Sequence, residues 1–500
     1  MLFATFSPRI RSFSTLWLIE MWERFGYYGM AALMVLFMVG RLGFPDIQAN
    51  LTWGVFGALV YAMPAVGGWI GDQVLGTRRT MILGAMVLAL GYFLLAAGGH
   101  GVTALFVSLG VIVVGNGLFK ANAGNLVRQI FADTPEKLDS AFTFYYMAVN
   151  VGSTLSMLAT PWIQERWGWR QAFAVSLAGL LLGLVNYAFM RQTLARVKSP
   201  SDAKPLRLQA ISAVLAGGAV IVAVVVFILE HGDLAAICIY TAGVIVLFIF
   251  GNMIRKTAGP ERAGLTVALI LTLQSIFFFI FYQQMATSLT LFALRNVRPA
   301  FDILGVHLFD FSPAQFQALN PLIIIVASPP MAILYAWLAR RRMDPPISVK
   351  FFLGFVSVAV GFFVFGASEH LADDGGTVSS WLMVAGYFFY TMGEILVSAL
   401  GLAMIARYVP ARMSGFMMGV YFISTGVAQY LGSVVANIAH IPAALTDPVQ
   451  TLPVYTRLFN ILGLAATGCA VVAVALLPIL ARYSARHGAG EAEPTRAVGS

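Results

Sequence analysis

Residues 18–30, LIEMWERFGYYGM, lie inside an apolar run long enough to cross a membrane, yet they carry Glu20, Glu23 and Arg24. Each charge left in hydrocarbon costs about 2.5–3.5 kcal/mol on insertion scales, so such side chains usually pair with one another or face a water-filled cavity. This stretch is therefore expected to be a membrane span that carries part of a functional site.

The composition of the whole chain indicates a multi-spanning membrane protein. Of its 500 residues, 59% are hydrophobic and 11% are charged, whereas a typical soluble domain has about 25% charged residues. The net charge of +9 does not indicate a nucleic-acid partner, because the Lys and Arg residues are scattered through short loops. The expected surroundings are a lipid bilayer, and no nucleic acid is expected.

Fourteen apolar runs are expected to cross the membrane as helices. Six lie near residues 14–38, 51–71, 80–98, 102–124, 141–163 and 171–190, two near 208–230 and 234–254, and six near 264–293, 316–339, 350–368, 378–406, 414–438 and 455–480. Two groups of six helices are typical of transporters built from two similar halves around a central site. A channel or a membrane enzyme could share this helix count.

The expected fold class is thus an all-α integral membrane protein with two six-helix bundles and an inserted two-helix hairpin. The predicted parts are an N-terminal bundle over 1–195, a linker with the hairpin over 196–260, a C-terminal bundle over 261–483 and a disordered tail over 484–500. With a cytoplasmic N-terminus, about 23 of the 31 Lys and Arg residues fall on cytoplasmic segments. The charge pattern therefore predicts that both termini are cytoplasmic.

The charges that remain in spans indicate a proton-binding site. On a helix, Glu20, Glu23, Arg24 and Tyr27 share one face, with Tyr28 at its edge. Lys120 and Glu394 also lie within spans, which gives two bases against three acids. The surplus carboxyl can bind and release a proton as its partners rearrange. The alternatives are an ion pair that only aids packing, a Lys120 that reaches the cytoplasmic surface, and a structural role for Glu394.

Other chemistries have no support in the sequence. No Cys, His or acidic cluster has the spacing of a metal site, and no phosphate-binding glycine motif occurs in a strand-to-helix context. No histidine lies in a predicted span, so proton coupling must use carboxylates. We expect no cofactor and no metal, with protons as the coupling ion.

The sequence resembles the proton-dependent oligopeptide transporter family of the major facilitator superfamily. Its first span matches that family's E-x-x-E-R-F-x-Y-Y-G motif, and further similar stretches follow in the family's order. They include GGWIGDQVLGTRRT, GNGLFKANAGNLV, FYYMAVNVGS, QQMATSLTLFA, LNPLIIIVASP, GEILVSALGL and SGFMMGVYF. The resemblance implies a major facilitator fold in a bacterial inner membrane, and a secondary transporter instead of an enzyme.

The resemblance also implies roles for individual residues. Glu20, Glu23 and Arg24 would couple proton uptake to transport, together with Lys120. Residues implied to bind substrate are Arg24, Tyr27, Tyr28, Tyr61, Lys120, Asn150, Asn320 and Glu394, with the cations at the peptide carboxylate and Glu394 at its amino end. Asp72, Arg78 and Arg79 resemble the superfamily's cytoplasmic latch, and Gln284 and Ser398 are pocket candidates by spacing alone.

The sequence departs from the family pattern at four positions. Ala31 and Gln283 stand where an arginine and an acidic residue commonly form an outer gate. Phe279 replaces a frequent pocket tryptophan, and Ala121 replaces a proline after the lysine. The outer gate must therefore close without the arginine–acid pair. The sequence does not predict which peptide side chains are preferred.

The expected function is proton-coupled import of di- and tripeptides by alternating access, by a protein expected to be a monomer. The nearest alternative is the same fold carrying another solute, such as nitrate, a drug or a modified amino acid. A channel would not concentrate solute in response to pH, and a membrane enzyme would release an altered product.

Overall fold

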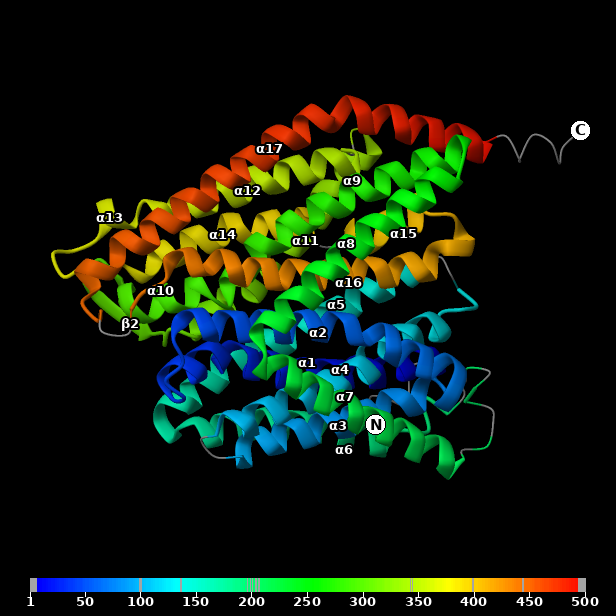
Figure 1. Cartoon of the computed structure of the whole chain (residues 1–500), viewed down its shortest axis with the longest axis horizontal. Coiled ribbons are helices and arrows are strands. Elements are labelled where there is room, and N and C mark those ends of the chain that lie inside the picture. Colours follow the sequence, from blue (N-terminus) through cyan, green and yellow to red (C-terminus); the bar gives the residue numbers. More distant parts are fainter. Residues whose placement is uncertain are drawn as a thin grey trace, which may run out of the picture. The chain divides into compact units, whose positions relative to one another are not determined.

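The computed structural model describes residues 7–492 except 99–100, 135–136, 196, 198, 200, 203–204, 206, 342, 344, 398–399 and 443–444. The chain divides into two compact units (Figure 1). The first unit contains residues 1–235 and Phe311–Ile325, and the second contains Ala236–Asp310 and 326–500. The expected boundaries at 195 and 260 differ from this division, because the inserted hairpin is shared between the two units.

Among the described residues, seven long helices lie wholly within the first unit. They are α1 (Pro8–Gly40), α2 (Asp46–Ile70), α3 (Thr77–Ala97), α4 (Val102–Ile130), α5 (Leu138–Trp167), α6 (Trp169–Met190) and α7 (Leu208–Glu230). A π-helical turn, Gly71–Leu75, extends α2. Helices satisfy every backbone hydrogen bond within one segment, which a bilayer requires of a spanning chain.

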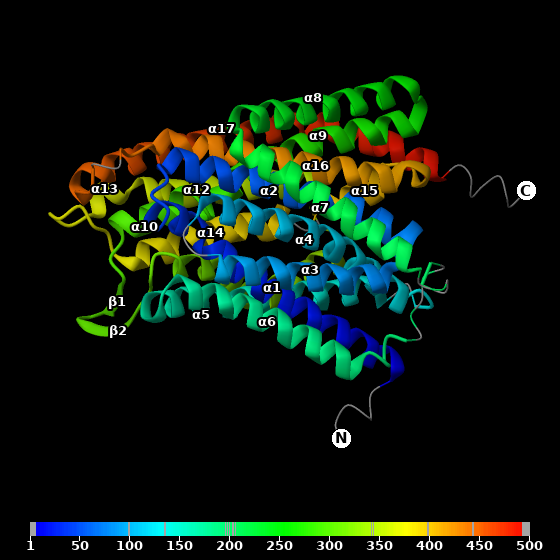
Figure 2. The ribbon, with the colours of Figure 1, turned by 60° about the horizontal axis from the view of Figure 1, so that its bottom comes forward.

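Small residues let the helices of the first unit approach closely. α1 packs along α5 and α6, and α4 packs along α2 and α3 (Figure 2). A Cβ atom placed on Gly67 of α2 would lie 1.9 Å from the carbonyl oxygen of Gly117 on α4, so a larger residue cannot occupy this crossing. Gly168, at φ +90°, is the single residue between α5 and α6. Its left-handed conformation permits the sharp reversal of the chain.

The remaining helices belong largely to the second unit. They are α8 (Gly232–Lys256), α9 (Gly259–Tyr282), α10 (Ser288–Asn296), α11 (Leu319–Arg340), α12 (Ile347–Gly366), α13 (Ser368–Leu371), α14 (Ser380–Val397), α15 (Leu400–Tyr408), α16 (Ala411–Ala436) and α17 (Pro448–Ala492). Short 3-10 helices cover Gln283–Met285, Gln315–Ala318 and Asn437–Ala439. α17 packs along α12 and α9, as Figure 1 shows.

The fourteen expected spans each correspond to one helix or to two consecutive helices. Among the described residues, twelve helical segments are long and apolar enough to cross a membrane. The two other expected spans are α1 and α5, which have 33 and 30 residues. α1 is less apolar than the other spans because it carries Glu20, Glu23 and Arg24. α5 is less apolar because it is rich in Ser, Thr and Tyr.

One loop of the second unit forms an antiparallel strand pair that the all-helical expectation did not include. β1 (Ala300–Ile303) pairs with β2 (Val306–Asp310), with Ala300 opposite Asp310. Leu304 and Gly305 have φ values of 50° and 82°, which suits the two central residues of a tight hairpin turn.

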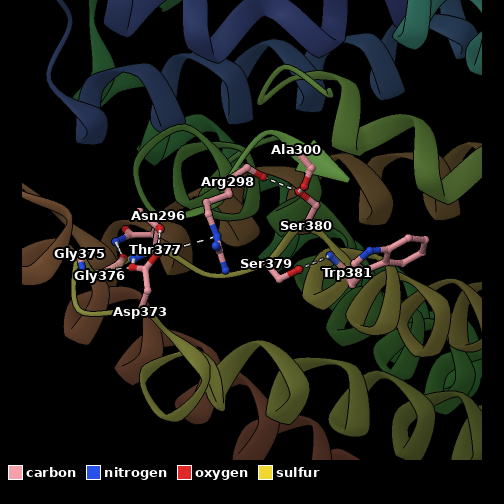
Figure 3. A network of polar contacts seen from close by, with 10 residues as sticks. All are labelled: Asn296, Arg298, Ala300, Asp373, Gly375, Gly376, Thr377, Ser379, Ser380 and Trp381. Carbon is pink, nitrogen blue, oxygen red and sulfur yellow. Dashed lines mark hydrogen bonds and ion pairs between the residues drawn. The ribbon is translucent and has the colours of Figure 1, made fainter. Parts of the chain in front are cut away.

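A polar network fixes the base of this hairpin (Figure 3). Ser380 Oγ donates to the carbonyl oxygens of Arg298 and Ala300, at 2.5 and 2.8 Å. In the same network, the Asn296 side chain donates to the carbonyl oxygen of Gly376 at 2.9 Å. Hydrogen bonds from Thr377 to the Asp373 carboxylate hold the pKa of Asp373 below its usual range.

The expectation of a disordered tail from residue 484 is wrong for residues 484–492, because α17 continues to Ala492. His487 fastens this extension within the second unit. Its Nδ1 and Nε2 atoms lie 3.2 Å from the Pro260 carbonyl oxygen and 3.0 Å from the Arg407 carbonyl oxygen. The rest of the predicted tail, residues 493–500, lies outside the described residues.

Candidate functional site

The three charged residues of α1 are buried inside the first unit and contact one another. Glu20, Glu23 and Arg24 are 3%, 0% and 4% exposed. Arg24 Nε lies 3.3 Å from Glu20 Oε1 and also donates a hydrogen bond to Glu23 Oε2. Glu20 lies four residues before Arg24 and so shares its helix face, and Glu23 is its neighbour in the sequence. One guanidinium thus contacts both acids. The structure thus brings together the proton-coupling residues predicted on this helix.

Tyr145 on α5 is a further member of this site that the sequence analysis did not identify. Its hydroxyl donates a 2.5 Å hydrogen bond to Glu20 Oε2. Both oxygens of the Glu20 carboxylate therefore have a donor or a cation beside them. Tyr145 lies in the FYYMAVNVGS stretch, but nothing in a single sequence distinguishes it from the neighbouring Tyr146.

The second acid is less completely bonded. Among the residues that the structure describes, Glu23 Oε1 and Arg24 Nη2 have no hydrogen-bond partner although both atoms are buried. Two carboxylates and one guanidinium leave this part of α1 with one excess negative charge when all are ionised. A buried carboxylate oxygen without a donor is a favourable place for a proton to bind.

Lys120 lies close enough to this triad to interact electrostatically with Arg24, Glu23 and Glu20. Within the described part of the chain, no carboxylate oxygen lies within 4.0 Å of its Nζ atom. Instead, Nζ lies 4.7 Å from the ring centre of Tyr61, at the distance of a cation–π contact. The half-buried ammonium therefore makes no direct ion pair with the described carboxylates in this conformation.

The predicted tyrosines of α1 are next to the charged triad. The Arg24 guanidinium carbon lies 5.4 Å from the ring centre of Tyr27, and the rings of Tyr27 and Tyr28 pack edge to face with their centres 5.4 Å apart. All of these residues, with Lys120 and Tyr61, belong to the first unit. The structure thus places two cations beside aromatic rings in one unit.

The other predicted substrate-binding residues are buried. Asn150 on α5 donates to the Tyr146 carbonyl oxygen of its own helix at 2.9 Å. Asn320, at the start of α11, is 3% exposed and belongs to the first unit. Glu394 on α14 is 6% exposed, belongs to the second unit and interacts electrostatically with Tyr390 of the same helix. Ser398 lies outside the described residues.

The predicted latch residues Asp72, Arg78 and Arg79 lie around the turn between α2 and α3 and make hydrogen bonds there. Asp72 Oδ1 accepts a hydrogen bond from Asn125 at 3.1 Å, and Arg78 Nη1 donates to the Leu194 carbonyl oxygen at 3.0 Å. Arg79 Nη1 donates to the Leu75 carbonyl oxygen at 3.4 Å.

The acid that contacts this turn most directly is Asp202, which the sequence analysis missed. Its Oδ2 atom accepts bonds from Ser199 Oγ at 2.8 Å, Ser199 N at 3.2 Å and Arg78 N at 3.4 Å. Asp202 follows α6 in a polar linker, where a charged residue gives no signal in hydropathy. The structure thus connects the α2–α3 turn to the linker.

The departures from the family pattern have ordinary packing roles within their units. Ala31 is buried on α1. Gln283 Nε2 donates to Ser433 Oγ on α16 at 3.3 Å, and Gln284 Nε2 donates to the Gly432 carbonyl oxygen at 2.9 Å. The ring of Phe279 packs edge to face on Tyr282, with centres 6.1 Å apart. Gln283 therefore connects α9 to α16 without a charge.

Comparison with known proteins gives this site a context. The family model described as POT family matches residues 78–453. Dipeptide and tripeptide permease A of Salmonella typhimurium (strain LT2) is 41% identical over 475 residues, covering 95% of this chain and 93% of the relative. The permease A of Escherichia coli (strain K12) is 39% identical over 483 residues, covering 96% and 95%.

Solved structures agree with this result. A bacterial homologue of the human drug peptide transporters PepT1 and PepT2 has a TM-score of 0.87 at 54% identity, covering 95% of this chain and 99% of that chain. Tetrameric PepTSo2 has a TM-score of 0.87 at 53% identity, covering 95% and 100%. Peptide transporter POT in complex with sulfate has a TM-score of 0.81 at 30% identity, covering 95% of each chain.

These similarities define a multi-pass membrane transporter with the major facilitator fold. The chain belongs to the POT family.

Proposed function

We propose that this chain is a proton-coupled symporter that imports di- and tripeptides by alternating access. The observation that carries the proposal is the buried triad on α1, in which Glu20 and Glu23 share the single guanidinium of Arg24. Relatives named dipeptide and tripeptide permeases over nearly the whole chain support the substrate class. The chain would use the proton gradient as its energy source, with no cofactor and no metal.

In the proposed cycle, a proton binds to the α1 triad and weakens the hold of the carboxylates on Arg24. Arg24 and Lys120 then receive the carboxylate of the peptide, since a charge-assisted bond to a carboxylate is stronger than a neutral one. Lys120 suits this role because it makes no direct ion pair with a described carboxylate. Glu394 is the proposed partner of the peptide's amino group, and Asn150, Asn320, Tyr27, Tyr28 and Tyr61 are the proposed neutral contacts.

Competition in proteoliposomes tests the substrate. The purified full chain is reconstituted, a pH gradient acid outside is imposed, and uptake of labelled dialanine is measured against unlabelled di- and tripeptides, nitrate, single amino acids and cationic drugs. We expect short peptides to compete and acid outside to concentrate the label. Competition by nitrate, a drug or a modified amino acid but not by peptides would favour the alternative, the same fold with another solute.

We further propose that the protein resides in the bacterial inner membrane with both termini in the cytoplasm. The excess of Lys and Arg on alternate loops supports this orientation. Cysteine-accessibility labelling at residues 9 and 486 tests it, because both should react only after the membrane is opened.

A monomer stays the sequence prediction for the oligomeric state, and the tetramer solved for a relative at 53% identity makes a tetramer the alternative. Light scattering in detergent distinguishes the two.

A further inference from the structure

Three buried hydroxyl groups beside α1 have no hydrogen-bond partner among the residues that the structure describes. They belong to Tyr92 on α3, Thr160 on α5 and Ser176 on α6, and all three residues are 0% exposed. A buried polar group without a partner costs about 1–3 kcal/mol, so such groups call for a specific explanation.

These hydroxyls differ from most buried hydroxyls in the helices of this chain. Ser108, Thr154 and Thr272 each donate to the carbonyl oxygen one turn back on their own helix, at 2.7 Å. Serine and threonine in helices commonly make this bond. Thr160 and Ser176 are also helical but do not make it, so their hydroxyls are available to another partner.

The three groups lie beside the part of α1 that comes after its charged residues in the sequence. A Cβ atom on Gly26 would lie 2.9 Å from Tyr92 Cε2 and 3.0 Å from the Ser176 carbonyl oxygen. A Cβ atom on Gly29 would lie 2.6 Å from Thr160 Oγ1 and 3.2 Å from Ser176 Oγ. Gly26 and Gly29 are roughly 4.5 and 9 Å beyond Glu23 along the helix axis. The hydroxyls therefore lie at two successive levels beside this helix.

The spacing of the last two hydroxyls suits a bridging water molecule. Because both lie near the same point at Gly29, Thr160 Oγ1 and Ser176 Oγ are at most about 6 Å apart, yet they do not bond each other. A water molecule needs two to four polar partners to be held in a protein interior, and these hydroxyls can supply them.

The ring of Tyr92 lies beside Gly26, three residues after Glu23, the acid proposed to bind the proton. The Glu23 carboxylate and the Tyr92 phenol are close enough to interact electrostatically. Glu23 Oε1 and Arg24 Nη2 are themselves buried without hydrogen-bond partners among the described residues. Buried polar atoms without hydrogen-bond partners among the described residues therefore lie beside α1 at the levels of Glu23, Gly26 and Gly29.

At the other end of the same bundle, a small cavity of about 10 Å³ lies between α1, α3 and α4. Phe37, Leu94, Leu105 and Ser108 are among the residues that line it. A cavity of this size is close to the smallest that holds one water molecule. This cavity lies toward the end of α1 that the loop charges place outside.

We propose that Tyr92, Ser176 and Thr160 line a water-assisted proton path through the first helical bundle that ends at Glu23 Oε1. Each hydroxyl oxygen accepts one proton and releases its own, so every hydroxyl ends unchanged and Glu23 gains one O–H bond. The path lies within one bundle and avoids Arg24 and Lys120, the cations proposed to hold the peptide. This inference rests on the proposed function, since it assigns the route of the coupling proton.

Variants that remove only the hydroxyl test the path in proteoliposomes of the full chain. Tyr92→Phe, Ser176→Ala and Thr160→Val should each slow uptake of dialanine driven by a pH gradient about 100-fold, the lower end of the range for a lost proton-transfer group. Counterflow of labelled dialanine at equal pH on both sides should stay within about twofold of the unmutated protein. Thr160→Ser, which keeps the hydroxyl, should restore the driven rate.

Ser156→Ala is the matched control. Ser156 is as buried as Thr160 and lies one turn away on the same helix, but its hydroxyl already donates to the Ser153 carbonyl oxygen at 3.1 Å. The proposed path would be overturned if Tyr92→Phe and Thr160→Val showed the same pH-driven uptake as Ser156→Ala. It would also be overturned if uptake and counterflow were lost equally. If the unmutated protein itself shows no pH-driven uptake, the proposed function fails, and the path fails with it.

Discussion

Tyr145 on α5 donates a 2.5 Å hydrogen bond to Glu20 Oε2 on α1, while Arg24 Nε lies 3.3 Å from the other oxygen of the same carboxylate. Glu23 has no equivalent second donor among the described residues, since its Oε1 atom is unpartnered. The two acids of α1 are therefore in different surroundings. Glu20 has a partner at each carboxylate oxygen, and Glu23 is the position that we propose for the transported proton.

Replacing Tyr145 by phenylalanine should slow pH-driven uptake. A hydrogen bond to a charged group contributes about 1.5–3 kcal/mol. Without this donor, the Glu20 carboxylate loses one of the two contacts that hold it in the triad. The effect is measured as initial dialanine uptake under a pH gradient. In a Glu20→Gln background the same substitution should have no further effect, and an additional loss there would contradict the role of this bond.

Lys120→Met should weaken peptide binding. Loss of a charge-assisted bond to the peptide carboxylate is expected to raise the half-inhibitory concentration of dialanine about 10- to 100-fold. Competition against a labelled peptide measures this change. Lys137→Met is the control, because Lys137 is exposed at the start of α5. Equal affinity in the two variants would exclude Lys120 from the peptide site.

Asp202→Asn should loosen the turn between α2 and α3. The replacement converts an acceptor of three hydrogen bonds from Ser199 and Arg78 into a neutral amide, so it should lower the free energy of unfolding by about 1–3 kcal/mol. Thermal unfolding in detergent, followed by tryptophan fluorescence, measures the effect. Asp133→Asn, at an exposed position, is the control. Matching melting temperatures for the two variants would show that Asp202 has no such role.

His487 should stabilise the second unit by fastening the end of α17. Its ring nitrogens lie 3.2 and 3.0 Å from the carbonyl oxygens of Pro260 and Arg407. Because a typical hydrogen bond contributes about 0.5–1.5 kcal/mol, His487→Ala should lower the free energy of unfolding by about 1 kcal/mol or more.

Melting temperatures of the unmutated chain and of His487→Ala measure this contribution. The variant should melt at the lower temperature. Equal melting temperatures would show that the contacts of His487 do not stabilise the unit.

The sequence was sufficient to predict the helical spans and the α1 charges, because both depend on hydropathy along one helix. Hydropathy also explains why α1 stands out, since three ionisable residues within five positions are rare in a span. The position of Lys120 followed from the same reasoning. The contact of its ammonium with the ring of Tyr61 joins α4 to α2, and hydropathy along one helix does not predict such a contact.

Contacts between helices could not be predicted from one sequence. Tyr145 and Asp202 act through neighbours 125 and 124 residues away, and the spacing of residues along the chain does not encode such distances. The β1–β2 hairpin was missed because its turn, Leu304–Gly305, carries only a weak local signal in a loop between two spans. The helical extension of α17 was missed because its small polar residues resemble a disordered tail, while His487 fastens it by tertiary bonds.

The central claim is that Glu23 receives the proton that drives transport. The most direct test compares Glu23→Gln with the unmutated protein in proteoliposomes, measuring pH-driven accumulation and peptide counterflow in the same preparation. Glutamine keeps the shape but cannot exchange a proton, so accumulation should vanish while counterflow persists. Accumulation that survives in this variant, or a parallel loss of both activities, would contradict the claim.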